Sequence, residues 1–352
     1  MSVEMLASRI GVLDEAAMAA ARARQDQLTK PQGSLGRLED LSVQLAGITG
    51  QCPPPIPERR AVLVFAGDHG VVAQGVSAFP QEVTPQMVLN FLRGGAAINV
   101  LARQANARVT VVDAGVAAEI PPTDGLVSGK IAAGTQDFTL GPAMTRDQAL
   151  AALELGVRVA RAEIERGLDL LACGDMGIGN TTPSAAITAV ITGRSVRDVT
   201  GPGTGINRAA LERKVAVIEK AIDVNRPDPA DAIDVLSKVG GFEIGAIAGA
   251  MLAAGAERVP VVVDGFIATA GALIACTLAP NLRQFLIAGH RSQEPGHDLA
   301  LAHLGLQPLL DLRMRLGEGT GAVLAFHVIE AAARIINEMA TFAEAGVSER
   351  TD

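Results

Sequence analysis

One carboxylate set among glycines has the clearest chemical potential in this chain. Glu318 lies in the stretch Leu316-Gly317-Glu318-Gly319-Thr320-Gly321-Ala322, directly before a long apolar helical pattern. Glycine permits unusual backbone angles and a close approach of main chain to ligand. The stretch therefore predicts a loop that displays Glu318 as a general base, although an ordinary turn before a helix has the same pattern.

Two further glycine-rich stretches suit an anion. The stretch Gly174 to Thr182 follows a strand pattern and opens a helix, where free backbone N–H groups and the helix dipole favour phosphate. The stretch Gly201 to Gly205 also precedes a helix, and that helix carries Lys214, so it suits a monophosphate. The first stretch lacks the lysine of an ATP-binding P-loop. A plain turn and a solvated basic helix face remain the alternatives.

The stretch Gly289 to His297 contains two histidines and a glutamate, which together with Asp68 and His69 raise the question of a metal. Its spacing matches no pair of metal ligands on a helix, and Pro295 is expected to break helical geometry. We therefore predict no metal and interpret these residues as polar groups that order a loop. A separate stretch, Ser77 to Phe91, is either the start of a core helix or the wall of a pocket for a flat apolar ligand.

The elements that must position these residues alternate between two patterns. Short β-rich runs, each ending in Gly plus Asp or His, cover residues 61–66, 109–112, 168–173, 259–263 and 285–288. Helical patterns cover residues 84–103, 145–166, 181–192, 207–223, 243–256, 266–278 and 320–342, with more helices in residues 1–50. This alternation predicts an α/β fold with a parallel sheet and crossover helices. Ligands of such sheets bind outside the carboxyl ends of the strands.

The chain is expected to form two domains. The proline-rich run at residues 53–57 is a plausible boundary. We predict a large α/β substrate-binding domain at residues 58–305 and a small helical domain built from residues 1–52 and 306–352, which contributes the Glu318 loop.

Composition narrows the class of protein. The 352 residues are 49% apolar and carry a net charge of −8 with no basic block, which argues against nucleic acid as a partner. Three widely spaced cysteines without a C-x-x-C fit a reducing cytoplasm, and charges near the N-terminus argue against a signal peptide. The longest uncharged run, Gly265 to Leu282, is interpreted as a buried helix rather than a membrane span.

Together the motifs resemble the nicotinate-nucleotide–dimethylbenzimidazole phosphoribosyltransferase family. The resemblance runs in order across about residues 30 to 325 and includes the three glycine-rich stretches and Gly289 to His297. Three more stretches carry it: Lys30-Pro-Gln-Gly-Ser-Leu-Gly-Arg-Leu-Glu39, Phe65-Ala-Gly-Asp-His-Gly-Val71 and Asp264-Gly-Phe-Ile-Ala-Thr-Ala-Gly271.

The resemblance implies a Rossmann-like sheet with flanking helices, a smaller helical domain and a cytoplasmic homodimer with no cofactor. The implied reaction transfers ribose 5-phosphate from nicotinate mononucleotide to 5,6-dimethylbenzimidazole in cobalamin nucleotide-loop assembly. By position, Glu318 is the general base. The implied nucleotide and phosphate ligands are Asp175, Gly177, Gly179, Asn180, Thr181, Gly203, Thr204, Gly205, Lys214 and Ser292, and the implied base-binding residues are Gln86, Met176 and Leu316. Asp175 stands where the family usually has glutamate, which puts its direct contact with the reacting groups in doubt.

The implied chemistry needs one base. The leaving pyridinium departs neutral and needs no acid, while the incoming benzimidazole must lose one ring proton. The paired carboxylates of glycosidases are therefore not required. A kinase or hydrolase would need a P-loop lysine or metal-binding carboxylates, which the sequence does not show. A mononucleotide-sensing protein is the remaining alternative, and it would bind nucleotide without turnover.

Overall fold

Six parallel strands form the central sheet of the computed structural model, which describes residues 2–348. The strand order is β3-β2-β1-β4-β5-β6. The strands are β1 (Arg60–Gly67), β2 (Ala107–Gly115), β3 (Leu126–Ser128), β4 (Leu170–Met176), β5 (Val261–Val263) and β6 (Leu286–Ala288). The predicted α/β class and its five strands are confirmed. The neighbours β1 and β4 mark the point where the winding reverses, which is where doubly wound sheets bind ligands.

The central strands are buried on both faces because most of their residues are apolar: every residue of β1 and six of the seven in β4 are buried. Side chains of a strand alternate between the two faces, and β1 shows this directly. Ala61, Leu63 and Phe65 enter one apolar cluster, whereas the residues between them enter a second cluster on the other side.

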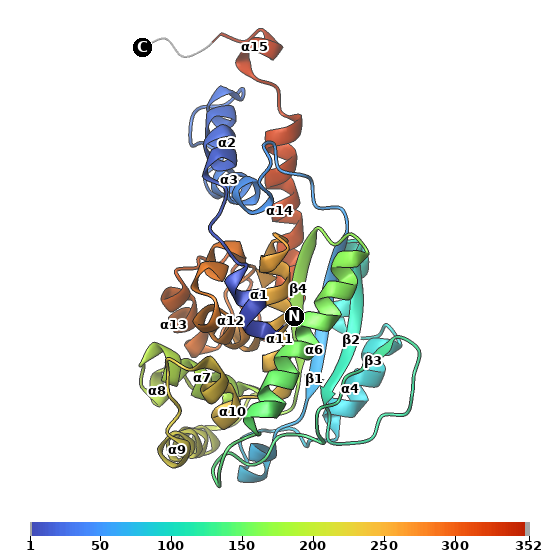
Figure 1. Ribbon diagram of the computed structural model, residues 1–352, viewed down its shortest axis with the longest axis vertical. Helices are drawn as coiled ribbons and strands as arrows, with labels where there is room; N and C mark the ends of the chain where they lie inside the picture. The colour runs from blue at the N-terminus through green and yellow to red at the C-terminus, as the bar shows by residue number, and fades with distance from the viewer. Residues whose placement is uncertain (1, 349–352) are drawn as a thin grey trace.

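Helices cover each face in separate layers (Figure 1). On one face lie α1 (Val3–Ser8), α6 (Arg146–Glu165), α7 (Thr181–Thr192), α8 (Val196–Val199), α9 (Arg208–Asn225), α10 (Ala232–Val239), α11 (Phe242–Ala256), α12 (Phe266–Leu278) and α13 (Pro295–Leu304). On the other face lie α3 (Arg37–Thr49), α4 (Val83–Leu92), α5 (Ala97–Gln104) and α14 (Thr320–Glu338). Short helical turns at η1 (Gly70–Gln74) and η2 (Pro280–Phe285) complete the layers.

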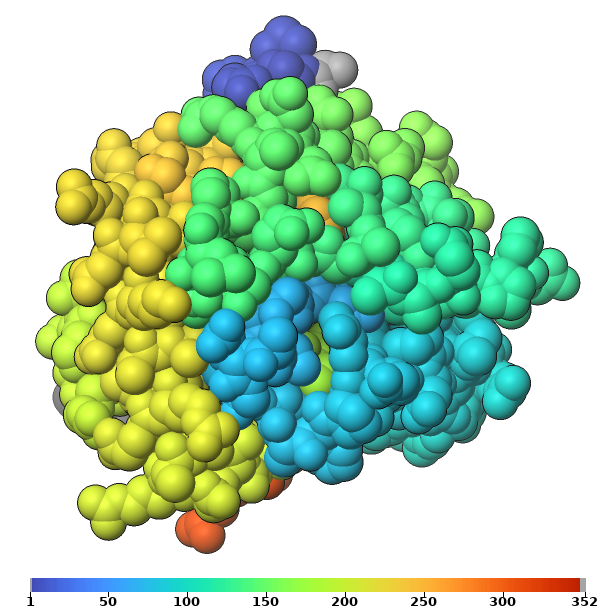
Figure 2. Space-filling model, turned by 90° about the horizontal axis from the view of Figure 1, so that it is seen from below, coloured from blue at the N-terminus to red at the C-terminus, as the bar shows by residue number. Residues whose placement is uncertain are grey.

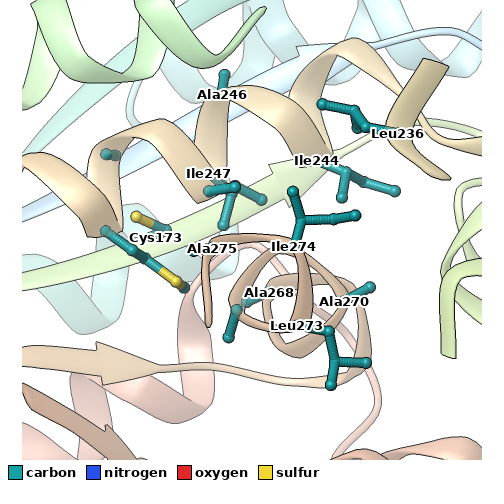
Figure 3. Packing of buried hydrophobic residues seen from close by; sticks show 14 of the residues in the cluster. Cys173, Leu236, Ile244, Ala246, Ile247, Ala268, Ala270, Leu273, Ile274 and Ala275 are labelled. Carbon is teal, nitrogen blue, oxygen red and sulfur yellow. The ribbon is translucent and has the colours of Figure 1, made fainter. Parts of the chain in front are cut away.

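The core of the helix layer that contains α11 and α12 is apolar and closely packed. Figure 3 shows Ile244 and Ile247 of α11 facing Ile274 of α12, next to the strand that carries Cys173. Every residue of α11 from Phe242 to Gly255 is buried. This layer packs against one face of the sheet and supports the strands whose carboxyl ends carry the loops.

A small helical group stands at the far end of the molecule (Figure 1). The helix α2 (Glu15–Gln27) packs with α3 and the last turns of α14 around Ala21, Ala46 and Ile336, and α15 (Phe342–Ala345) follows. Residues 15–49 therefore meet the C-terminal helices in this group, whereas α1 lies apart from it and packs against α11 and α6 (Figure 1). The domain limits at 1–52, 58–305 and 306–352 stay a prediction, and their residues 1 and 349–352 lie outside the described part.

Two local predictions were wrong. The helix expected at residues 84–103 is two helices, because Gly94 and Gly95 separate α4 from α5. Pro295 does not break a helix but begins one, since proline needs no partner for an N–H at the first helical position.

Among the described residues, α14 is the one helix long and apolar enough to cross a membrane, and 56% of its most apolar window is buried within the protein. Its inner side forms part of the second apolar cluster. The core helix of a soluble protein meets the same test of length and composition. The uncharged run that begins at Gly265 forms α12, a buried helix of 13 residues, as predicted.

Candidate active site

A cavity of about 250 Å³ lies at the carboxyl ends of the strands. Its walls come from the segments that follow β1, β4, β5 and β6, together with the Gly201–Gly205 loop and the stretch before Glu318. Figure 2 looks at the molecule from below, where a narrow hollow opens among the blue residues that follow β1. The predicted convergence of strand ends is therefore present.

Glu318 is buried rather than displayed, which corrects the sequence prediction. The residue is only 5% exposed, and its carboxylate accepts a hydrogen bond from the backbone N–H of Ile98 at 3.2 Å. Ile98 lies in the first turn of α5, where the helix dipole favours a negative charge. The backbone of Glu318 has φ +63°, a left-handed conformation unusual for a residue with a side chain. The surrounding packing must impose this conformation.

Two contacts impose it. The carboxylate of Asp264, at the end of β5, accepts hydrogen bonds from the N–H groups of Gly319 at 3.2 Å and Ala322 at 2.9 Å. On the other side, a Cβ at Gly174 of β4 would overlap the main chain of Glu318. Only glycine at position 174 lets the loop lie directly on the strand.

Burial changes the acidity of the carboxylates here. It raises the pKa of Glu318, against the hydrogen bond from Ile98, and thereby makes its carboxylate a stronger base. Asp175 shows a larger effect: burial, with the nearby charge of Asp264, raises its pKa to about 8. Asp175 accepts a hydrogen bond from the side chain of Asn180 at 2.8 Å. Near neutral pH, Asp175 is therefore mostly protonated while Glu318 can act as a base.

A buried lysine joins the two glycine-rich loops that were predicted to bind phosphate. The Nζ atom of Lys214 donates hydrogen bonds to Thr181 Oγ1 at 2.8 Å and to the carbonyl of Gly201 at 3.1 Å. Burial lowers the pKa of Lys214 to about 8, against the influence of Glu294. Thr181 is the first residue of α7 and lines the cavity together with Gly179 and Asn180, so the positive end of the helix dipole lies beside the cavity.

Most of the predicted site residues come together. Those that line the cavity are Asp175, Gly179, Asn180, Thr181, Gly203, Thr204, Ser292 and Leu316. Gly177, Gly205, Lys214 and Glu318 do not line it but belong to the same loops or bond to them. Met176 packs into the second apolar cluster, and Gln86 is exposed on α4 away from the cavity lining.

Sequence reasoning missed several lining residues. Phe79 and Leu316 are large apolar side chains more than half exposed at the cavity, but only Leu316 was predicted. Arg315, Glu294 and His290 also line it. Both Glu294 and His290 were noted as polar loop residues, and the only available signal was their position directly after β6.

No cluster of three or more His, Cys, Asp or Glu side chains within residues 2–348 has an arrangement that could hold a metal ion. A larger cavity, about 990 Å³, lies between α2, α3 and residues 302–307. It is remote from the strand-end loops, so size alone does not mark the site.

Comparison with known proteins agrees with this geometry. A family model described as phosphoribosyltransferase matches residues 10–347. The nicotinate-nucleotide–dimethylbenzimidazole phosphoribosyltransferase of Roseiflexus castenholzii is 62% identical over 345 residues, which cover 98% of each chain. The protein of the same name from Desulforudis audaxviator is 60% identical over 341 residues, covering 97% of this chain and 96% of that protein.

Solved structures extend the similarity to the fold. The crystal structure of the nicotinate-nucleotide–dimethylbenzimidazole phosphoribosyltransferase from Thermus thermophilus matches with a TM-score of 0.92 and 51% sequence identity. The match covers 96% of this chain and all of that one. The chain therefore belongs to the nicotinate-nucleotide–dimethylbenzimidazole phosphoribosyltransferase family.

Proposed function

We propose that this protein transfers the 5-phosphoribosyl group of nicotinate mononucleotide to 5,6-dimethylbenzimidazole. The products are α-ribazole 5′-phosphate and nicotinate. The observation that supports this function best is that the loop carrying a single basic carboxylate meets both glycine-rich loops at one cavity. The names of relatives about 60% identical over nearly the whole chain support catalysis rather than nucleotide sensing.

Glu318 acts as the general base in this reaction. The bond between ribose C1′ and the pyridinium nitrogen breaks, and its electron pair stays on nitrogen, so nicotinate leaves without an added proton. A ring nitrogen of the benzimidazole forms the new bond to C1′. The proton on its other nitrogen passes to the Glu318 carboxylate, whose raised pKa favours this transfer near neutral pH.

The two glycine-rich loops hold the nucleotide. Gly179 and Thr181 at the start of α7 line the cavity together with the Gly203–Thr204 turn and Ser292, and they suit the phosphate and ribose oxygens. Lys214 supports both loops through Thr181 and Gly201 and adds positive charge behind them. Gly177 and Gly205 contribute as parts of the same turns.

The benzimidazole lies against apolar groups. Leu316 and Phe79 present exposed apolar surface at the cavity, which a flat aromatic ring would cover. Met176 lies behind Asp175 in the second apolar cluster. The exposed position of Gln86 makes it the weakest of the proposed base-binding residues.

Product chromatography tests the function directly. Purified protein mixed with nicotinate mononucleotide and dimethylbenzimidazole should form α-ribazole 5′-phosphate and an equal amount of nicotinate, with EDTA present. Nucleotide binding without product would favour the sensing alternative. Activity abolished by EDTA and restored by a divalent ion would contradict the metal-free reaction.

We further infer that the enzyme is a cytoplasmic homodimer with two domains, as its family resemblance implies. Its three cysteines are unpaired, which fits a reducing compartment. Light scattering coupled to size exclusion should give twice the chain mass of 36.2 kDa. A monomer mass at catalytic concentrations would contradict the dimer.

A further inference from the structure

One residue of the Gly201–Gly205 loop, Gly203, is held through both its N–H and its carbonyl by charged side chains from other parts of the chain. The N–H of Gly203 donates a hydrogen bond to Glu294 Oε1 at 3.0 Å. The carbonyl of the same residue accepts one from Arg315 Nη1 at 2.7 Å. These partners lie 91 and 112 residues away in the sequence. Arg315 precedes Glu318 by three residues, so this contact joins the nucleotide loop to the loop of the base.

The burial of Glu294 shows that its position is built into the fold. The residue is only 4% exposed, and its second oxygen, Oε2, has no hydrogen-bond partner. A Cβ at Gly201 would overlap this oxygen, so the loop carries glycine where the carboxylate needs space. An ionised carboxylate in such a place requires nearby positive charge, and Lys214 and Arg315 are the cations that act on it.

We propose that Glu294 is a positioning residue that fixes Gly203 and, with it, the loop that holds the nucleotide together with Lys214. This inference rests on the proposed function, in which the Gly203 loop and Lys214 hold the nucleotide. Glu294 does not touch the reacting atoms. It acts by accepting the hydrogen bond of the Gly203 N–H, while Arg315 binds the carbonyl of the same residue.

The charge on Glu294 has a consequence for pH. Burial favours the neutral form of Lys214, and Glu294 is the charged group that opposes this effect. Arg315 faces Glu294 in turn, and the other polar partners of Lys214, Thr181 Oγ1 and the Gly201 carbonyl, carry no charge. Neutralising Glu294 should therefore lower the pKa of Lys214 further, so that the lysine loses its charge at a lower pH.

The test measures the affinity for nicotinate mononucleotide by titration calorimetry between pH 6 and 9. Glu294→Gln keeps the shape of the side chain and an oxygen for the Gly203 N–H but removes the charge. We expect affinity at neutral pH to fall roughly tenfold, the effect of losing a charge-assisted contact. The decline of affinity with rising pH should begin at a lower pH than in the wild type. Glu294→Asp keeps the charge but shortens the reach to the Gly203 N–H, so it should keep the wild-type pH profile at a reduced affinity.

A double-mutant cycle tests whether Glu294 and Arg315 act on Gly203 together. Arg315→Gln should also weaken nucleotide binding, and the double variant with Glu294→Gln should lose clearly less than the product of the two single losses, because both side chains hold the same residue. Asp298→Asn and Arg313→Gln are the matched controls. Asp298 is an exposed acid on α13 that pairs with Arg291, and Arg313 is an exposed arginine outside the cavity lining.

The outcomes separate this inference from the proposed function. Product formation by the wild-type protein reports on the function alone. An unchanged nucleotide affinity and pH profile in Glu294→Gln would overturn the positioning role, as would strictly independent losses in the double variant. Should Glu294→Gln fail to fold, Glu294→Asp decides: a shorter carboxylate that leaves both affinity and KM unchanged would equally overturn the role.

Discussion

The helix layer that contains α11 and the edge of the sheet where the strands end differ in what they bury. The layer buries apolar side chains, whereas the edge also buries ionisable ones. In the layer, α11 is buried from Phe242 to Gly255 with Glu243 as its one charged residue. At the strand ends, by contrast, Asp175, Asp264 and Lys214 are buried ionisable groups: burial raises the pKa of both carboxyl groups and lowers the pKa of Lys214. Buried charge is costly unless it is paired. The apolar burial in the helix layer offsets this cost and stabilises the fold that holds the ionisable groups in place.

Glycine shows the same contrast. At Gly249 a Cβ would overlap the backbone of Leu153, so this glycine lets α11 and α6 pack closely. At Gly174 the equivalent atom would overlap the backbone of Glu318. The first glycine serves stability, and the second permits the position of a chemical group. Substitutions in the two regions should therefore separate folding from turnover.

The largest expected effect is on turnover at the charged edge. Glu318→Gln keeps the side-chain shape but removes the base. We expect kcat to fall about 10²–10⁴-fold, equivalent to roughly 3–5 kcal/mol of barrier. The affinity for nicotinate mononucleotide should change little, because the proposed ligands of the nucleotide are the two glycine-rich loops and Lys214, whereas Glu318 acts on the benzimidazole. Steady-state kinetics and calorimetry on one preparation measure both, and near-normal kcat would remove Glu318 from its assigned role.

The next effect is on nucleotide binding. Lys214→Ala removes the ammonium that joins Thr181 to Gly201, and we expect the affinity for nicotinate mononucleotide to fall by roughly 1.5–3 kcal/mol, the range for charge-assisted hydrogen bonds. Binding of free dimethylbenzimidazole should hardly change. Lys220→Ala, on the same helix, is the control. Equal loss of both ligands would indicate general damage rather than a nucleotide contact.

A substitution in the apolar helix layer should lower the free energy of unfolding and leave turnover unchanged. Gly249→Ala forces α11 away from α6, and overpacking of this kind costs about 1–3 kcal/mol of unfolding free energy. Gly141→Ala is the matched control, because a Cβ there meets no atom within 4 Å. Denaturant unfolding measures the difference, and kcat of the folded variant should stay near wild type. A large loss of kcat would show that the two regions are not separable.

The smallest expected effect concerns Asp175. Burial raises the pKa of Asp175 in the folded protein to about 8, whereas the ordinary pKa of an aspartate side chain is 3.8, so the native state binds an extra proton between these pH values. The stability contributed by this proton therefore falls as pH rises across that window. Asp175→Asn removes the titration, and its melting temperature should vary less with pH than that of the wild type.

Turnover provides the second measurement on this variant. Because Asp175 is mostly neutral at pH 7, Asp175→Asn should lower kcat by less than about tenfold, well below the usual contribution of a general base. If Asp175→Asn were inactive while Glu318→Gln kept its turnover, the roles of the two carboxylates would be reversed.

Patterns that depend on neighbours in sequence were predictable. The helices α7 and α12 lie at the predicted residues, because their caps and apolar runs are local. The three-residue strand β3 was missed, since its pairing with β2 depends on a partner strand rather than on its own composition. Pro295 was misread because a proline that begins a helix and one that ends it look alike without the preceding turn.

In the candidate site, too, only the features that depend on neighbours in the sequence could be predicted. Its glycine-rich loops were visible in the sequence, but the burial of Glu318 was not, because Ile98 is 220 residues away. The same holds for the contacts of Gly203 with Glu294 and Arg315. Gln86 was placed from family resemblance alone, and the direction in which a helical side chain points cannot be taken from a motif.

The helix α14 also fixes a rotational relationship between distant parts of the molecule. It begins two residues after Glu318 and ends among α2 and α3, which its 19 residues place about 28 Å away. Inserting or deleting one residue within it would turn everything beyond that point by about 100°. The length of α14 thus fixes how the terminal helices are rotated about its axis relative to the strand-end loops. The terminal helices can keep their facing toward the strand-end loops only if its length changes by whole turns, whereas the irregular segment at residues 305–317 can vary without this constraint.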